Sequence, residues 1–292
     1  MCRLLGYTSP TPVSAADLIG TDDCRQWQNL GRLHDDGWGT AWIRPETDSA
    51  ESARPQGTTS GTFDIGPEVQ DTVSRGGRLE RYRTPYEGAD DSHLTEVLTS
   101  RPTVSRITHL RMATNGTVGL TENSHPFLAD NIALAHNGSI HPIERLREYA
   151  TAAEVERIGG TTDTAIIFAL ILRRVAEGES LFHATIATVR TLRADFDHPG
   201  INLLVLSAEE MIVVHATAGT PIPYQNFDTS GTDGELPPDH KDHYYRMSWQ
   251  RFDDGAMIVS SSGLDHQGWS LIEQNTAMRL TVADGAETVV GV

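Results

Sequence analysis

Short apolar runs rich in β-branched residues at both ends of the chain place the strongest constraint on its fold. Each run has the length and pattern of a β-strand. The eight runs cover residues 3–9, 39–43, 106–114, 131–135, 201–206, 211–216, 256–260 and 277–282. Three helical patterns, 142–153, 164–176 and 181–192, lie in the middle of the chain, and Asp163 is a candidate N-cap for the second. Strands at both ends with helices between them predict an α+β fold.

The length of 292 residues suits one large domain or two ordinary ones. Two segments carry loop composition: 45–62 is rich in Ser, Thr, Gly and Pro, and 218–243 contains four prolines and several acids. Both are long for simple connections, so we expect lids, binding loops or irregular excursions there. We treat 1–292 as a single domain with these two excursions.

Charge and cysteine content limit the classes of binding partner and the cellular compartment that fit this chain. The 23 Lys and Arg residues against 40 Asp and Glu give a net charge of −17, which opposes binding to nucleic acid or to anionic lipid. The basic stretch 75–83 is short and predicts a solvated strand edge. No apolar run reaches the ~20 residues of a membrane span, and no signal-peptide pattern is present. With only Cys2 and Cys24, no disulfide framework is expected, although a single bridge between them is an alternative. These features predict a cytoplasmic protein.

Cys2 follows directly on the initiator methionine. Removal of Met1 would leave a thiol and a free α-amine on one residue, and an α-amine with a reference pKa of about 7.7 to 8.0 is partly unprotonated at neutral pH. A cysteine thiol is an intrinsically strong nucleophile. The position therefore predicts a nucleophile that carries its own base. The alternative is a small apolar side chain in the first strand.

The sequence Ala-His-Asn-Gly-Ser at 135–139 ends an apolar run. As a turn signal, Asn137-Gly138 needs no functional role. As a functional pair, the Asn137 carboxamide and the Gly138 backbone N–H could donate to a developing oxyanion, because glycine permits close approach of the backbone.

Arg111 and Asp163 are candidates for charge recognition. Arg111 lies near the end of another predicted strand, where its guanidinium would hold a carboxylate in two parallel hydrogen bonds or form an internal ion pair. Asp163 precedes an apolar helix, where it could cap the helix or accept a substrate ammonium. Together the two side chains could hold both ends of an α-amino acid.

The remaining polar motifs carry less information. The turn at 34–39 and the loop at 123–127, which contains His125, are each predicted to be structural. The twelve histidines form no recognisable metal-ligand pattern, and two cysteines cannot build a common structural zinc site. We therefore predict no metal and no cofactor.

Five motifs in this order resemble the class II glutamine amidotransferases, which are N-terminal-nucleophile hydrolases. They are Cys2, Asp-Gly-Trp-Gly at 36–39, Arg-Met-Ala-Thr at 111–114, His-Asn-Gly at 136–138 and Thr-Asp-Thr at 162–164. Region 201–282 is also similar to stand-alone members, including ergothioneine-pathway amidohydrolases. The resemblance implies a four-layer αββα sandwich of two antiparallel sheets.

The resemblance also implies a role for each matching residue. Cys2 would attack a γ-carboxamide and form a γ-glutamyl thioester, with Asn137 and Gly138 as the oxyanion hole. Arg111, helped by Thr114, would bind the α-carboxylate of the glutamyl group, and Asp163 its α-ammonium. Asn115 departs from better-known members, which have His there.

Three functions fit this resemblance. The chain could be a glutaminase that feeds ammonia to a separate synthase subunit, or a hydrolase of a small-molecule γ-glutamyl conjugate. A catalytically silent binding protein is the third, and the intact set of candidate residues counts against it. The first two need the same glutamyl-binding residues, so the sequence does not separate them.

Overall fold

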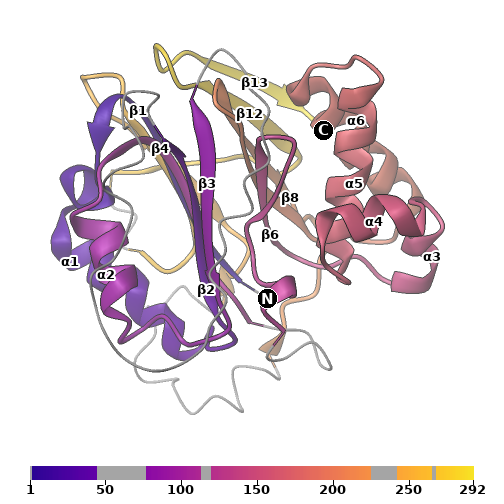
Figure 1. Cartoon of the computed structure of the whole chain (residues 1–292), viewed down its shortest axis with the longest axis horizontal. Coiled ribbons are helices and arrows are strands. Elements are labelled where there is room, and N and C mark those ends of the chain that lie inside the picture. The colour runs from indigo at the N-terminus through magenta and orange to yellow at the C-terminus, as the bar shows by residue number, and fades with distance from the viewer. Residues whose placement is uncertain (1, 45–76, 113–119, 225–241, 265–267) are drawn as a thin grey trace.

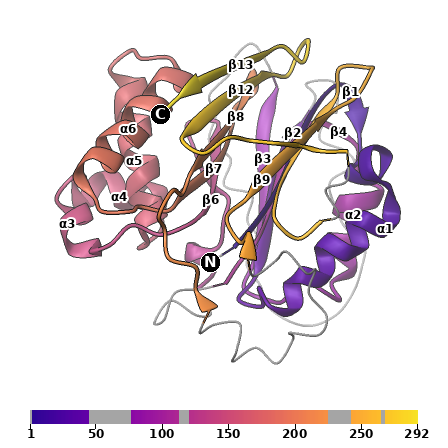
Figure 2. The ribbon, with the colours of Figure 1, turned by 180° about the vertical axis from the view of Figure 1, so that it is seen from behind.

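The computed structural model describes residues 2–44, 77–112, 120–224, 242–264 and 268–292. Two antiparallel sheets face each other, and helices cover the outer face of each sheet (Figure 1). The expected α+β, four-layer αββα sandwich is confirmed. Figure 2 shows the same four layers from behind, with α1 and α2 on one outer face and α3 to α6 on the other.

Each sheet is built from antiparallel neighbours along its whole width. The seven-stranded sheet has the order β11 (Ser270–Leu271), β9 (Met247–Arg251), β10 (Met257–Ser261), β1 (Arg3–Val13), β4 (Thr103–Leu110), β2 (Trp38–Arg44), β3 (Arg78–Thr84). The six-stranded sheet has the order β13 (Glu287–Gly291), β12 (Thr276–Thr281), β8 (Glu210–Ala216), β7 (Ile201–Leu206), β6 (Ile132–Asn137), β5 (Phe127–Ala129).

The helices form two groups. The first comprises α1 (Ala15–Asn29), α2 (Ser92–Thr99) and the short 3-10 turn η1 (Leu30–Arg32). The second comprises α3 (Ile143–Arg147), α4 (Ala152–Ile158), α5 (Asp163–Ala176) and α6 (Leu181–Asp195). A second 3-10 turn, η2 (Thr121–Asn123), precedes β5.

Alternation along the strands explains why the sheets pack on both faces. In β1, Leu4 belongs to the core between the sheets, whereas Leu5 and Tyr7 pack under α1 and α2. In β6, Ala133 faces the other sheet and Leu134 faces α5. Because successive side chains point to opposite faces, each such strand contributes to two apolar layers.

All eight predicted strands exist, but the helices differ from expectation. Expected helix 142–153 is two helices, because Thr151 caps α4 in a reciprocal capping box with Glu154. Asp163 is not an N-cap: Thr162 holds that position and Asp163 is the first residue of α5. The prediction that helices lie mainly in the middle missed α1 and α2, and Ser14 with Asp17 forms the capping box that begins α1.

The loop and charge predictions have mixed outcomes. The basic stretch 75–83 contributes β3, which is the outer strand of its sheet, as expected for a strand edge. Excursion 45–62 and the larger part of 218–243 lie outside the described residues. Within the described residues, no helix combines the length and apolar character needed to cross a bilayer.

Candidate active site

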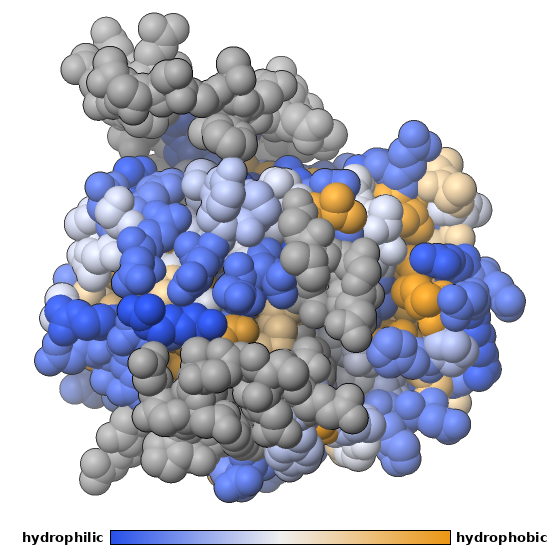
Figure 3. Space-filling view, turned by 90° about the horizontal axis from the view of Figure 1, so that it is seen from below, coloured by the Kyte–Doolittle hydropathy of each residue, from blue (hydrophilic) through white to orange (hydrophobic). Residues whose placement is uncertain are grey.

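The candidate residues gather where several strand ends meet, at the end of the molecule that carries the N-terminus (Figure 1). Arg3 at the start of β1 pairs with Leu110 at the end of β4. Asn137 ends β6 in the facing sheet. Seen from below, the described surface at this end is mostly hydrophilic, with scattered hydrophobic side chains (Figure 3).

Cys2 lies buried between the two sheets, with 7% of its surface exposed. Its backbone nitrogen donates to the Asn137 side-chain oxygen Oδ1 at 3.0 Å, and its Sγ lies 3.9 Å from the carbonyl oxygen of Met112. These contacts join residues that are 135 and 110 positions apart in sequence. Cys2 is thus held by the end of β6 and by the segment that follows β4.

Only one of the two polar groups of the Asn137 carboxamide has a hydrogen-bond partner among the described residues. Its Oδ1 accepts from Cys2, whereas its Nδ2 is buried and has no hydrogen-bond partner among the described residues. Leaving a buried donor unsatisfied costs about 1 to 3 kcal/mol, so such a group calls for a specific reason. A donor beside a cysteine is placed to meet negative charge that develops on a bound carbonyl oxygen.

Gly138 follows Asn137 where the chain passes close to another backbone segment. A Cβ at Gly138 would overlap the carbonyl of Gly200, so only glycine fits without a shift. The Gly200 backbone N–H in turn donates to the Ser139 carbonyl at 2.9 Å. The turn and the candidate oxyanion donor are therefore compatible uses of the same two residues.

Arg111 is fixed by the Asp-Gly-Trp-Gly turn. Its guanidinium Nη1 donates to the carbonyl of Asp36 at 3.1 Å, and its backbone N–H donates to the carbonyl of Gly37 at 2.8 Å. Gly37 has a φ of +120° and its Cα faces the Thr84 carbonyl, which together require glycine. The turn that the sequence marked as structural thus orients a candidate recognition residue that is only 3% exposed.

Asp163 is tied to the segment that follows Asn137. One carboxylate oxygen accepts from the Ile140 backbone N–H at 3.0 Å and the other from the Thr164 backbone N–H at 2.8 Å. These bonds fix the carboxylate at the start of α5, where the helix dipole favours negative charge. Thr114 and Asn115 lie outside the described residues, so their predicted roles stay predictions.

Three buried histidines lie behind the Asn137 turn. His136 Nε2 donates to the Gly200 carbonyl and its Nδ1 meets the Thr164 hydroxyl, both at 2.9 Å. The His136 backbone N–H lies 3.4 Å from His125 Nδ1, which makes that nitrogen an acceptor, and His109 Nε2 donates to it at 3.0 Å. Hence the loop that contains His125 supports the strand that ends at Asn137.

Burial keeps His109 and His125 neutral. Desolvation lowers the pKa of His109 to about 3, and desolvation followed by the charges of His109 and His136 places the pKa of His125 well below its usual value. Protonation of His125 at Nδ1 would also remove the acceptor for His109 Nε2 and for the His136 backbone N–H. His109 and His125 therefore act as neutral supports.

Arg3 and Asn202 belong to the site but were not expected from the sequence. Arg3 is fully buried and donates from Nε to His34 at 3.1 Å and from Nη1 to the Tyr244 carbonyl at 2.9 Å. Asn202 pairs across the strands with Asn137 and donates to the Tyr245 carbonyl at 2.8 Å. The sequence signal that could have identified Arg3 and Asn202 is a charged or amide side chain inside an otherwise apolar strand.

Cys24, the second cysteine, lies away from this group. It packs between α1 and the sheet, and burial raises the pKa of its thiol to about 12. Both cysteines are free, so the alternative of a Cys2–Cys24 disulfide is wrong. No group of three or more metal-ligating side chains was found in the part of the chain that the structure describes.

Comparison with known proteins identifies the family. Residues 1–224 match the family model of class-II glutamine amidotransferases. The chain belongs to the class-II glutamine amidotransferases. A glutamine–fructose-6-phosphate aminotransferase from Pseudomonas syringae pv. tomato is 31% identical over 149 residues, which cover 50% of this chain and 23% of that protein. The chain thus matches less than a quarter of that relative's length.

Solved structures of the same kind share the fold. A glutamine aminotransferase class-II domain protein from Silicibacter pomeroyi superposes with a TM-score of 0.56 at 15% identity, over 98% of each chain. The glutamine phosphoribosylpyrophosphate amidotransferase of B. subtilis gives 0.56 at 17% identity, over 99% of this chain and 49% of that one. Among class-II glutamine amidotransferases, this chain therefore has both the family sequence pattern and the family fold.

The buried histidines generate a pH prediction. The pKa of His109 is lower in the folded protein than in the unfolded chain, so the unfolded chain binds more protons as the pH falls. The contribution of neutral His109 to the free energy of unfolding is therefore complete above pH ~6.5 and is lost as the pH falls toward 3. We expect His109→Gln to reduce the slope of unfolding free energy between pH 6 and 5 by up to about 1.4 kcal/mol per pH unit. Urea unfolding at each pH measures it. The exposed His183, changed to Gln, is the control and should leave the slope unaltered; equal slopes for all three proteins would contradict the account.

Proposed function

We propose that this class-II glutamine amidotransferase hydrolyses the γ-amide of glutamine or of a γ-glutamyl compound, with Cys2 as its nucleophile. The single observation that carries the proposal is the arrangement of Asn137. Its oxygen holds the Cys2 nitrogen at 3.0 Å while its Nδ2 stays buried without a protein partner. One carboxamide would thus orient the base and stabilise the oxyanion.

The reaction begins once Met1 has been removed, because the Cys2 nitrogen is then an amine instead of an amide. The Cys2 thiol loses its proton to this amine as Sγ bonds to the γ-carbonyl carbon. The carbonyl oxygen becomes an oxyanion, which Asn137 Nδ2 and the Gly138 N–H stabilise. The proton then passes to the leaving nitrogen, the C–N bond breaks, and ammonia or an amine departs.

Water completes the cycle. It attacks the γ-glutamyl thioester, the amine of Cys2 takes its proton, and the C–S bond breaks to release glutamate and the free thiol. No cofactor enters this scheme. Arg111 would bind the α-carboxylate and Asp163 the α-ammonium of the glutamyl group. Both side chains are already held by backbone groups, which reduces the ordering cost of binding.

The fate of the leaving nitrogen depends on what lies beyond the scissile bond. A separate synthase subunit that accepts ammonia fits one version of the proposal, and direct release of an amine from a conjugate, as in ergothioneine-pathway amidohydrolases, fits the other. A silent scaffold is disfavoured, because the chain retains the full set of Cys2, Arg111, Asn137 and Asp163.

Exchange of each cysteine tests the proposal. We expect Cys2→Ala to abolish glutamate release from glutamine and labelling by a glutamine-analogue electrophile, because the bond-forming sulfur is gone. Cys24→Ala is the matched control: its thiol pKa is raised to about 12, so loss of that thiol should leave both readouts intact. Thermal melting confirms that each variant is folded. Active, labelled Cys2→Ala protein would refute the assignment.

Substitution of Asn137 separates its two roles. We expect Asn137→Ala to lower kcat by roughly 10²- to 10³-fold, with a smaller change in KM, because the Nδ2 donor acts mainly in the transition state. Asn137→Asp keeps an acceptor for the Cys2 nitrogen but lacks the donor, so it should lose a comparable factor. Steady-state glutamine hydrolysis measures both. Full turnover by folded Asn137→Asp would leave Asn137 as a turn residue only.

A further inference from the structure

A row of polar side chains crosses the six-stranded sheet at the end that carries the candidate active site. Asn137 on β6 lies opposite Asn202 on β7. On the next two strands, His215 of β8 lies opposite Asn202, and Thr276 of β12 lies opposite His215. All four side chains are buried. Because directly opposite residues share one face of an antiparallel sheet, the row extends across four strands from the residue that binds the Cys2 nitrogen.

The row faces the other sheet, where the neighbouring side chains are apolar. The residues two positions away along each strand all belong to the core between the sheets: Ala135, Leu204, Val213 and Met278. Side chains two positions apart in a strand point the same way. A buried polar group with an unmade hydrogen bond destabilises a fold, so an apolar side chain would be favoured at such positions on stability alone. Polar side chains here call for a specific reason.

Asn137 and Asn202 each leave one polar atom unused, and the two atoms are complementary. The Tyr245 carbonyl can only accept, so Asn202 turns its Nδ2 toward it at 2.8 Å and leaves Oδ1 without a partner among the described residues. The Cys2 nitrogen donates to Asn137 Oδ1, so the Asn137 atom without such a partner is Nδ2. A buried donor and a buried acceptor thus belong to residues that lie opposite each other in the sheet.

The Asn202 side chain is fixed at its other end. Strand β7 is hydrogen-bonded to β6 on one side and to β8 on the other, so its backbone has no open edge. Tyr245, whose carbonyl accepts from Asn202, is itself buried, and its ring meets the Tyr244 ring edge-on with 5.1 Å between the ring centres. Asn202 Oδ1 is therefore an acceptor held in advance at the position next to Asn137.

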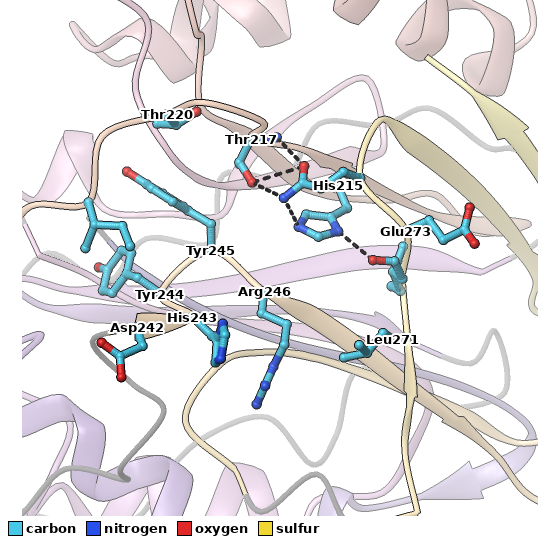
Figure 4. Close-up of a pocket in the computed structure, with 13 residues that line it drawn as sticks. His215, Thr217, Thr220, Asp242, His243, Tyr244, Tyr245, Arg246, Leu271 and Glu273 are labelled. Atoms are coloured by element: carbon cyan, nitrogen blue, oxygen red, sulfur yellow. Dashed lines mark hydrogen bonds between the residues drawn. The ribbon is translucent and has the colours of Figure 1, made fainter.

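His215, the neighbour of Asn202 on the other side, is fully engaged elsewhere. Its Nδ1 donates to the Ile272 carbonyl at 2.8 Å, and its Nε2 accepts from Gln274 Nε2 at 2.9 Å, at the wall of a pocket (Figure 4). Burial lowers the pKa of His215, which favours the neutral ring that these two bonds require. Since both ring nitrogens are used, Asn137 is the cross-strand neighbour that remains for Asn202 Oδ1.

We propose that Asn202 is a positioning residue for the oxyanion donor Asn137. The Nδ2 group of Asn137 carries two hydrogens; in the reacting enzyme one meets the oxyanion and Asn202 Oδ1 accepts the other. The Asn137 carboxamide is then held at both ends, by Cys2 at its oxygen and by Asn202 at its nitrogen. This inference rests on the proposed function, in which Nδ2 stabilises the oxyanion. The bond between the two amides forms as substrate binds, since catalytic hydrogen bonds commonly tighten in the complex.

A double-mutant cycle tests this role in the purified full chain. Asn202→Leu removes the acceptor at nearly constant volume, and we expect kcat to fall roughly tenfold with KM changed less than about twofold, because the lost bond orients a donor that acts in the transition state. In the Asn137→Ala background the same exchange should change kcat less than about twofold, because the group that Asn202 orients is already gone. Glutamate release from glutamine and from γ-glutamyl-p-nitroanilide measures both effects.

Thr188→Val is the matched control. Thr188 lies on α6 in the outer helical layer, is buried, and has an Oγ1 without a partner among the described residues, so its exchange also removes an unsatisfied polar atom. It should leave kcat unchanged. A tenfold loss from Asn202→Leu in both backgrounds, or full kcat in folded Asn202→Leu, would refute the positioning role while the proposed function stands. Absence of Cys2-dependent hydrolysis of either substrate by the wild type would refute the proposed function and this inference with it.

A crystal structure of the wild-type protein keeps the test independent of how Asn202→Leu folds. The protein is first labelled at Cys2 with a glutamine-analogue electrophile that retains the γ-carbonyl. We expect Asn137 Nδ2 and Asn202 Oδ1 to lie within about 3.5 Å of each other in this adduct, in the range of a hydrogen bond. A larger separation would contradict the proposed positioning role.

Discussion

The hydrogen bond between the Cys2 nitrogen and Asn137 Oδ1 is the interaction on which the rest of the site depends. It joins the residue before β1 in one sheet to the last residue of β6 in the other, so it forms only when both sheets have their correct order and register. The same carboxamide keeps its Nδ2 buried without a hydrogen-bond partner among the described residues. Fold and chemistry are thereby coupled through one side chain, and the bonds of His136 to His125 and to Gly200 hold the end of β6 that carries it.

The facing sheets bring residues of different origin to one edge. Cys2 precedes β1, Arg111 follows β4 and residues 242–246 precede β9, and these strand ends lie at one edge of the sheet because antiparallel neighbours start and end at the same edge. At the same edge, Met112 packs in one apolar cluster with Tyr244, Tyr245 and Ile222, so the segment after β4 is joined to the segments before β9.

Sequence reasoning located the strands, because these depend on local pattern. Cys2, Arg111 and Asn137 each stand at one end of an apolar run, and such positions reach the edge of a sheet, whereas Asp163 begins α5. The helix errors were also local: Ser14 and Thr151 begin helices through capping boxes that the hydrophobic pattern alone did not reveal. The roles of Arg3, Asn202 and His109 could not be predicted, since each contacts residues at least 16 positions away and depends on tertiary packing.

The account requires that the nitrogen held by Asn137 is a free amine, and intact-protein mass spectrometry of a glutamine-hydrolysing preparation tests this most directly. The predicted result is a mass that lacks Met1, with the N-terminal peptide beginning at Cys2 and carrying the label of a glutamine-analogue electrophile. A fully active preparation in which every molecule retains Met1 would contradict the account, because the Cys2 nitrogen would then be an amide with no useful basicity.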